Sequence, residues 1–99
     1  MRTINEWAEY ISEWRERKGF ETSWANMPEK LLLVITEIAE AAEALRDNPT
    51  GSDNFKEELA DTAIRLLDIV GTVGINLDEE IDKKMQINEG RPIKHGRQF

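Results

Sequence analysis

The sequence contains no cysteine and only one histidine, His95, among its 99 residues. Without cysteine the chain has no disulfide framework, no thiolate metal site and no thiol nucleophile. Its longest uninterrupted apolar run, residues 31–35, is far shorter than the roughly 20 residues that cross a bilayer. Residues 1–10 lack the apolar core of a signal peptide. We therefore expect a cytoplasmic protein with no membrane partner and a single domain over residues 1–99.

Basic residues are also scarce, since 13 Lys and Arg stand against 20 Asp and Glu and give a net charge of −7. The imbalance is uneven: residues 1–82 carry −11 and residues 83–99 carry +4. General nucleic-acid binding depends on neutralising phosphates, so the acidic body argues against it. An acidic body beside a basic tail allows a cation and an anion to be held close together. The alternative is that the tail is only a solvated charged segment.

Apolar residues recur with the spacing of amphipathic helices over four stretches. Thr3 and Glu6 have the spacing of a capping box at the start of the first helix, and Pro28 suits the first turn of the second. These patterns predict an all-α fold, a bundle of two long antiparallel helices with shorter N- and C-terminal helices. The predicted helices span 3–18, 28–47, 53–73 and 77–88, joined by irregular segments at 20–27 and 48–51 and followed by an irregular tail over 91–99.

The third predicted helix is apolar around most of its circumference, which is typical of a helix buried on most sides. The chain is too short to cover such a helix, so we predict a homo-oligomer, either a dimer or a tetramer, with this helix near its centre. Within its polar strip we expect Arg65 and Asp68 to pair with each other, with a metal-ligand role for Asp68 as the lesser alternative. The strip occupies about 80° of arc and consists of Glu58, Asp61, Arg65, Asp68 and Thr72.

Two carboxylate pairs stand on the two long helices, Glu37 with Glu40 and Glu58 with Asp61. Residues three apart lie on one side of a helix, so antiparallel neighbours would bring all four acids together. Like charges that close disfavour being ionised together unless a cation lies among them. All-carboxylate ligation suits Mg²⁺ or Mn²⁺, whereas di-iron bundles need Glu-x-x-His pairs, which the chain lacks. The alternative is four structural or solvated acids, and the residues alone leave the two interpretations balanced.

This pattern, Glu37-x-x-Glu40 followed by Glu58-x-x-Asp61, resembles the ExxE…ExxD signature of the MazG-like nucleoside triphosphate pyrophosphohydrolases, a group of all-α enzymes. The likeness covers most of the chain, from Trp24 into the tail. Thr36 stands where many members have a further glutamate. The matching tail residues are Lys84, Asn88, Arg91-Pro92 and His95-Gly96.

The resemblance implies Mg²⁺-dependent hydrolysis of (deoxy)nucleoside triphosphates between the α and β phosphates, giving a monophosphate and pyrophosphate, as in nucleotide house-cleaning. Mg²⁺, or Mn²⁺ in its place, would be held by the four acids, which would also be the catalytic residues. Such chemistry depends on positioning, on charge stabilisation and on a metal-bound water as nucleophile. The candidate substrate-binding residues, with Trp24 suited to stack on a base, are Trp24, Lys30, Lys84, Asn88, Arg91, Lys94 and His95.

Two other functions are weighed against this one. The chain can be a non-catalytic helical homo-oligomer that acts as a binding or interaction module. It can also bind nucleic acid through its basic tail, which the acidic body opposes. For each candidate substrate-binding residue, a surface charge or a helix-end contact is the competing interpretation.

Overall fold

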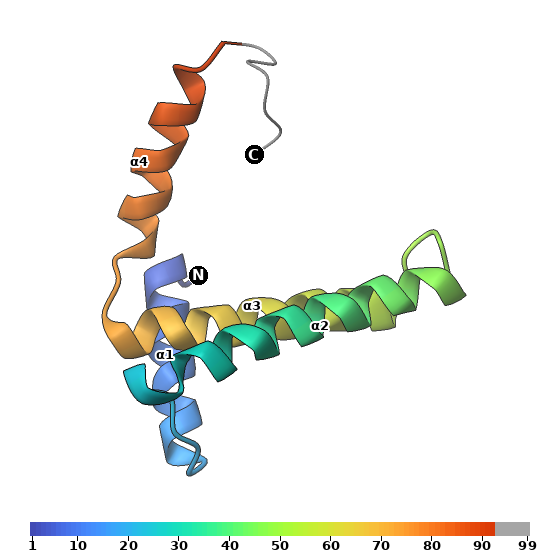
Figure 1. Ribbon diagram of the computed structural model, residues 1–99, viewed down its shortest axis with the longest axis horizontal. Coiled ribbons are helices and arrows are strands. Elements are labelled where there is room, and N and C mark those ends of the chain that lie inside the picture. The colour runs from blue at the N-terminus through green and yellow to red at the C-terminus, as the bar shows by residue number, and fades with distance from the viewer. Residues whose placement is uncertain (93–99) are drawn as a thin grey trace.

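The computed structural model describes residues 1–92, and this part of the chain is built from helices alone (Figure 1). The predicted all-α class is confirmed, and the predicted helix bounds agree with the structure to within one residue at each end. None of the described helices is long and apolar enough to cross a membrane. The elements are α1 (Ile4–Arg17), a short 3₁₀ turn η1 (Trp24–Asn26), α2 (Met27–Asp47), α3 (Asp53–Val73) and α4 (Leu77–Glu89).

Three helices begin where they do because a side chain satisfies a free backbone N–H in the first turn. The predicted capping box is confirmed: Thr3 Oγ1 accepts from the Glu6 N–H at 3.1 Å, and the Glu6 carboxylate accepts from the Thr3 N–H at 2.7 Å. Ser52 and Asn76 cap α3 and α4 in the same way. Residues 20–27, predicted to be irregular, contain the turn η1, where the Ser23 N–H donates to the Asn26 side chain at 2.8 Å.

Helices α2 and α3 form an antiparallel pair, and α1 packs across α3 on the side away from α2 (Figure 1). The crossing is close because both helices carry very small side chains there. Ala8 of α1 is buried, and a Cβ on Gly71 of α3 would lie only 2.2 Å from the Ala8 carbonyl oxygen. The backbones of α1 and α3 are therefore nearly in contact at this point.

Helix α2 carries a broad apolar face and, next to it, a narrower stripe of side chains. The narrower stripe is the part of α2 that is buried. Ala41 and Ala44 are buried against the rest of the chain, and their small side chains let the α3 backbone come close. Leu31, Ile35 and Ile38 on the broad apolar face remain 48%, 60% and 52% exposed. A single chain therefore leaves the most apolar face of α2 without cover.

Helix α4 extends away from the α2–α3 pair and has its main contacts with α1 (Figure 1). Its first turn is tied to α1 through Asn5, whose side-chain amide donates to Asn76 Oδ1 at 2.7 Å and whose carbonyl oxygen Oδ1 accepts from the Asp78 N–H at 3.2 Å. The rest of α4 carries exposed apolar side chains, among them Ile81 and Met85.

Candidate metal centre

Three of the four predicted acids meet between α2 and α3. One carboxylate oxygen from each of Glu37, Glu40 and Glu58 lies within 4.8 Å of the other two. Glu37 is buried at 8% exposure, Glu58 is half-buried and Glu40 is exposed. The short turn between the helices sets this register, because it folds α3 back along α2 and places Glu58 opposite the Glu37–Glu40 pair. We call these three residues the acidic cluster.

Asp61 is the predicted acid that the structure does not bring into the acidic cluster. It is exposed, and it follows Glu58 by three residues, which turns it about 60° round the helix axis. The described part of one chain thus offers three clustered carboxylates rather than four. The ligand role of Asp61 stays a prediction.

Arg65 pairs with Glu37, so the predicted pairing of Arg65 with Asp68 is wrong. Its Nε–H donates to Glu37 Oε1 at 2.7 Å. The polar strip of α3 is shared between two neighbours, because Arg65 faces α2 and Asp68 faces α1. The hydrogen bond from Arg65 holds the pKa of Glu37 below its ordinary value, against the opposing effect of burial.

Asp68, which is buried, belongs to a separate and partly buried network on the α1 side of α3. Its Oδ1 accepts from Arg15 Nε at 3.0 Å and its Oδ2 accepts from the Thr22 hydroxyl at 2.6 Å. Arg15 also donates to Thr72 Oγ1 at 2.7 Å and to the Phe20 carbonyl at 3.1 Å. Both carboxylate oxygens of Asp68 are therefore already bonded away from the acidic cluster, which favours a structural role over a ligand role.

Glu58 is the member of the acidic cluster whose carboxyl is least satisfied. The neighbouring Glu40 carboxylate raises the pKa of Glu58 to about 7, because a proton can be shared between the two acids, and burial and the nearby Glu37 add to the effect. Glu58 Oε2 is shielded from solvent and has no hydrogen-bond donor within the described residues. The oxygens around it belong to other carboxylates, so only a proton or a cation can stabilise them together.

The raised pKa of Glu58 predicts how the stability of the metal-free protein depends on pH. The carboxyl has a pKa of about 7 in the folded protein and an ordinary value of 4.5, so the folded state binds the proton more tightly. Stability therefore falls as the pH rises from 4.5 through about 7. Thermal melting in chelator should give a lower melting temperature at pH 8 than at pH 5.5, and Glu58→Gln should flatten the difference. An unchanged pH profile in that variant would contradict the assignment.

Among residues 1–92, no candidate substrate-binding residue forms a hydrogen bond or an ion pair with the carboxylates of the acidic cluster, whose one such partner is Arg65. Trp24 is 75% exposed in η1 and Lys30 is half-buried in the first turns of α2. Lys84 and Asn88 lie on α4, which leads away from the α2–α3 pair (Figure 1), and Arg91 lies two residues beyond the end of α4. Lys94 and His95 lie outside the described residues. Their roles remain predictions.

Two ion pairs between helices of the described chain were not foreseen from the sequence, that of Arg65 with Glu37 and that of Arg15 with Asp68. The spacing of Glu58 and Arg65, seven residues or about two helical turns, is the one signal that places Arg65 on the face of the acidic cluster.

Comparison of the chain with protein-family models, with curated proteins and with solved structures found no match. Any functional assignment therefore rests on the residues themselves.

Proposed function

We propose that the protein is a Mg²⁺-dependent nucleoside triphosphate pyrophosphohydrolase of the MazG-like type. The observation that carries the proposal is the convergence of Glu37, Glu40 and Glu58 within 4.8 Å, together with a shielded Glu58 oxygen that has no donor among residues 1–92. Carboxylate oxygens are the ligands that Mg²⁺ and Mn²⁺ prefer. The residue types and their spacing thus fit a hard divalent cation, and the resemblance in the sequence supplies the reaction.

In this proposal the acidic cluster holds the metal and Asp61, one turn further along α3, is the predicted fourth ligand. A bound Mg²⁺ would neutralise charge on the phosphate oxygens and lower the pKa of a bound water. The protein's part is to fix the acids on two packed helices, so that little reorganisation is needed when the substrate binds. Exposure of Glu40 leaves the cluster open to a triphosphate from the solvent side.

The test is the release of pyrophosphate from a panel of nucleoside triphosphates in the presence of Mg²⁺. Glu58→Gln should lower the rate by roughly 100-fold or more, because a metal contributes several kcal/mol of charge stabilisation. Glu57→Gln is the matched control, since Glu57 is the exposed neighbour of Glu58 on α3 and should retain activity. Orthophosphate as the first product would indicate a different phosphohydrolase. If no triphosphate is hydrolysed and the melting temperature is the same with and without Mg²⁺ or Mn²⁺, the non-catalytic binding module would be favoured.

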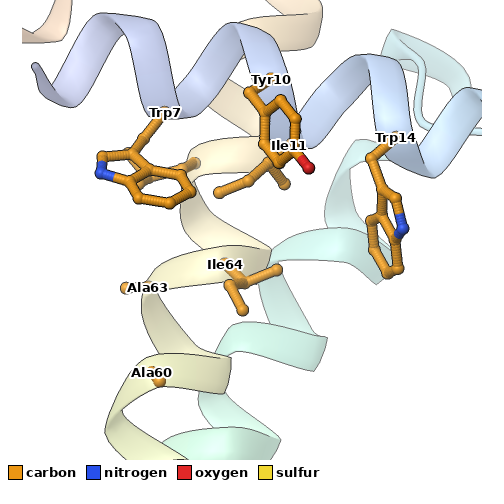
Figure 2. Close-up of a pocket in the computed structure, with 8 residues that line it drawn as sticks. Trp7, Tyr10, Ile11, Trp14, Ala60, Ala63 and Ile64 are labelled. Carbon is orange, nitrogen blue, oxygen red and sulfur yellow. The ribbon is translucent and has the colours of Figure 1, made fainter. Parts of the chain in front are cut away.

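We further infer that the functional unit is a homo-oligomer. In Figure 2, the aromatic side chains of α1 point towards the part of α3 that carries Ala60, Ala63 and Ile64, around an apolar cavity of about 440 Å³. The apolar face of α2 is exposed as well, and extended exposed apolar surface of this kind marks interaction sites in soluble proteins. The cavity is lined by Trp7, Tyr10, Ile11, Trp14, Ala60, Ala63, Ile64 and Leu67.

Light scattering should therefore give a mass at least twice the 11.4 kDa of one chain. Ile35→Glu, which places a charge on the uncovered face of α2, should shift the protein towards monomer or make it insoluble. Glu43→Gln, an exposed change on the same helix, is the control. A wild-type protein that stays monomeric at high micromolar concentration would contradict the inference.

A further inference from the structure

The acidic cluster already holds one cation, and it is supplied by the protein. The guanidinium of Arg65 donates from Nε to Glu37 Oε1 at 2.7 Å. The Glu37 side chain is 11% exposed, whereas that of Arg65 is 41% exposed. Among the ion pairs of residues 1–92, this is the one that reaches the cluster. Glu37 is therefore the fixed partner and Arg65 the accessible one.

This pair changes the electrostatics of the acidic cluster when no metal is bound. Three carboxylates within 4.8 Å repel one another, and a guanidinium at hydrogen-bond distance offsets part of that repulsion. Arginine suits the role because its charge is delocalised and less strongly hydrated than that of an ammonium group. Arg65 thus lowers the free energy of the metal-free cluster.

A divalent ion in the same cluster would have two unfavourable effects on the pair. It would draw electrons from the Glu37 carboxylate that accepts the hydrogen bond, and its two positive charges would repel the guanidinium. Glu37 cannot move easily, because it is buried between α2 and α3. Arg65 can turn outwards, since a large part of its side chain already meets solvent.

We propose that Arg65 is a built-in counter-ion of the acidic cluster, which a divalent cation must displace from Glu37 before the site fills. Arg65 then sets the metal concentration at which the protein becomes loaded. The inference rests on the proposed metal site and adds a positioning residue to it. The contrasting role is an arginine that stays bound to Glu37 and orients it for the metal, as outer ligands of metal sites often do. The two roles predict opposite changes in metal affinity.

The first experiment titrates Mn²⁺, and separately Mg²⁺, into chelator-treated, substrate-free protein in a calorimeter. Arg65→Met should bind the metal more tightly, with a dissociation constant lower by about tenfold, because the metal no longer breaks a charge-assisted hydrogen bond. Arg65→Lys, which keeps the charge but loses the planar fork, should lie between this variant and the wild type. Arg46→Met removes the same charge from an exposed position at the end of α2 and should stay within about twofold of the wild type.

The second experiment follows the arginine Nε–H signals of the wild-type protein by nitrogen-15 NMR, so it does not depend on a variant that folds. Addition of Mg²⁺ should shift the Arg65 signal and speed its exchange with water. The Arg15 Nε–H signal is the internal control, because its bond to Asp68, at 3.0 Å and with both side chains at most 14% exposed, lies outside the cluster.

The results separate this proposal from the metal site itself. Tighter binding by Arg65→Met together with release of the Arg65 Nε–H supports the counter-ion role. Weaker or unchanged binding by that variant, with the Nε–H signal retained in loaded protein, overturns it and leaves the metal site standing. If neither metal binds the wild type or any variant, the proposed metal site fails and the counter-ion role fails with it.

Discussion

Gly71→Ala is expected to destabilise the protein by about 2 kcal/mol, although alanine is the better helix former. A Cβ at this position would lie 2.2 Å from the Ala8 carbonyl oxygen and 2.7 Å from Ser12 Oγ. Overpacking of this kind costs about 3 kcal/mol, while the gain in helix propensity returns only about 1 kcal/mol. The obstacle is α1 backbone, which cannot rotate away as a side chain can, so the whole helix must shift.

Urea unfolding of the metal-free protein measures the effect as a lower midpoint for Gly71→Ala. Gly90→Ala is the control, since a Cβ at Gly90 would meet only the Ile87 and Gln86 carbonyl oxygens, at 3.5 and 3.8 Å, with an ordinary helical φ of −80°. That variant should be neutral or slightly stabilising. Equal midpoints for Gly71→Ala and the wild type would show that α1 and α3 do not pack this closely in solution.

The helix bounds could be predicted because the sequence carries their causes locally. Thr3, Ser52 and Asn76 each satisfy a backbone N–H of the turn that follows, and such contacts do not depend on the rest of the fold. Gly74 ends α3 in the left-handed conformation, with a φ of 73°. Features that are set within four or five residues of chain were thus predicted well.

Partners across the fold could not be predicted in the same way. Periodicity placed Arg65 and Asp68 in one polar strip of α3, but it does not say that α2 lies along one edge of the strip and α1 along the other. Each residue forms an ion pair with a different helix, Arg65 with Glu37 of α2 and Asp68 with Arg15 of α1. An ion pair between neighbours on one exposed helix face stabilises by only about 0.3–0.5 kcal/mol. Each side chain therefore pairs instead with a less exposed partner on another helix.

The candidate site was predictable in part for the same reason. Antiparallel packing of the two long helices follows from their short connection, and it brings Glu58 to Glu37 and Glu40. The outward turn of Asp61 depends on the angle at which α3 faces α2, which the spacing of residues does not determine. Likewise Gly71 fits the apolar pattern of α3 as well as alanine would, so its close approach to α1 becomes visible only in the structure.

The largely buried ion pair of Arg15 and Asp68 is expected to stabilise the packing of α1 against α3 more than any other single side-chain contact. Its side chains are 14% and 11% exposed. Removing one partner of such a pair leaves the other charge buried and costs about 3–5 kcal/mol, a large share of the roughly 5–15 kcal/mol that stabilises a domain. Arg15→Met and Asp68→Asn should each lower the urea midpoint markedly. Lys56→Met, which breaks the exposed Lys56–Asp53 pair, should change stability by at most about 0.5 kcal/mol.

The double variant of Arg15→Met with Asp68→Asn decides whether the two residues act as one unit. Once the arginine is gone, neutralising Asp68 removes an uncompensated buried charge, so the double variant should lose much less stability than the two single losses added together. Additive losses would mean that the two side chains are not coupled in solution.

Thr22 and Phe20 belong to the same network and lead into the segment that carries Trp24, whereas the acidic cluster lies on the other side of α3. Arg15→Met should therefore leave the Mn²⁺ affinity of the folded protein unchanged while Arg65→Met alters it, which separates the contact that holds the fold together from the contact that tunes the site.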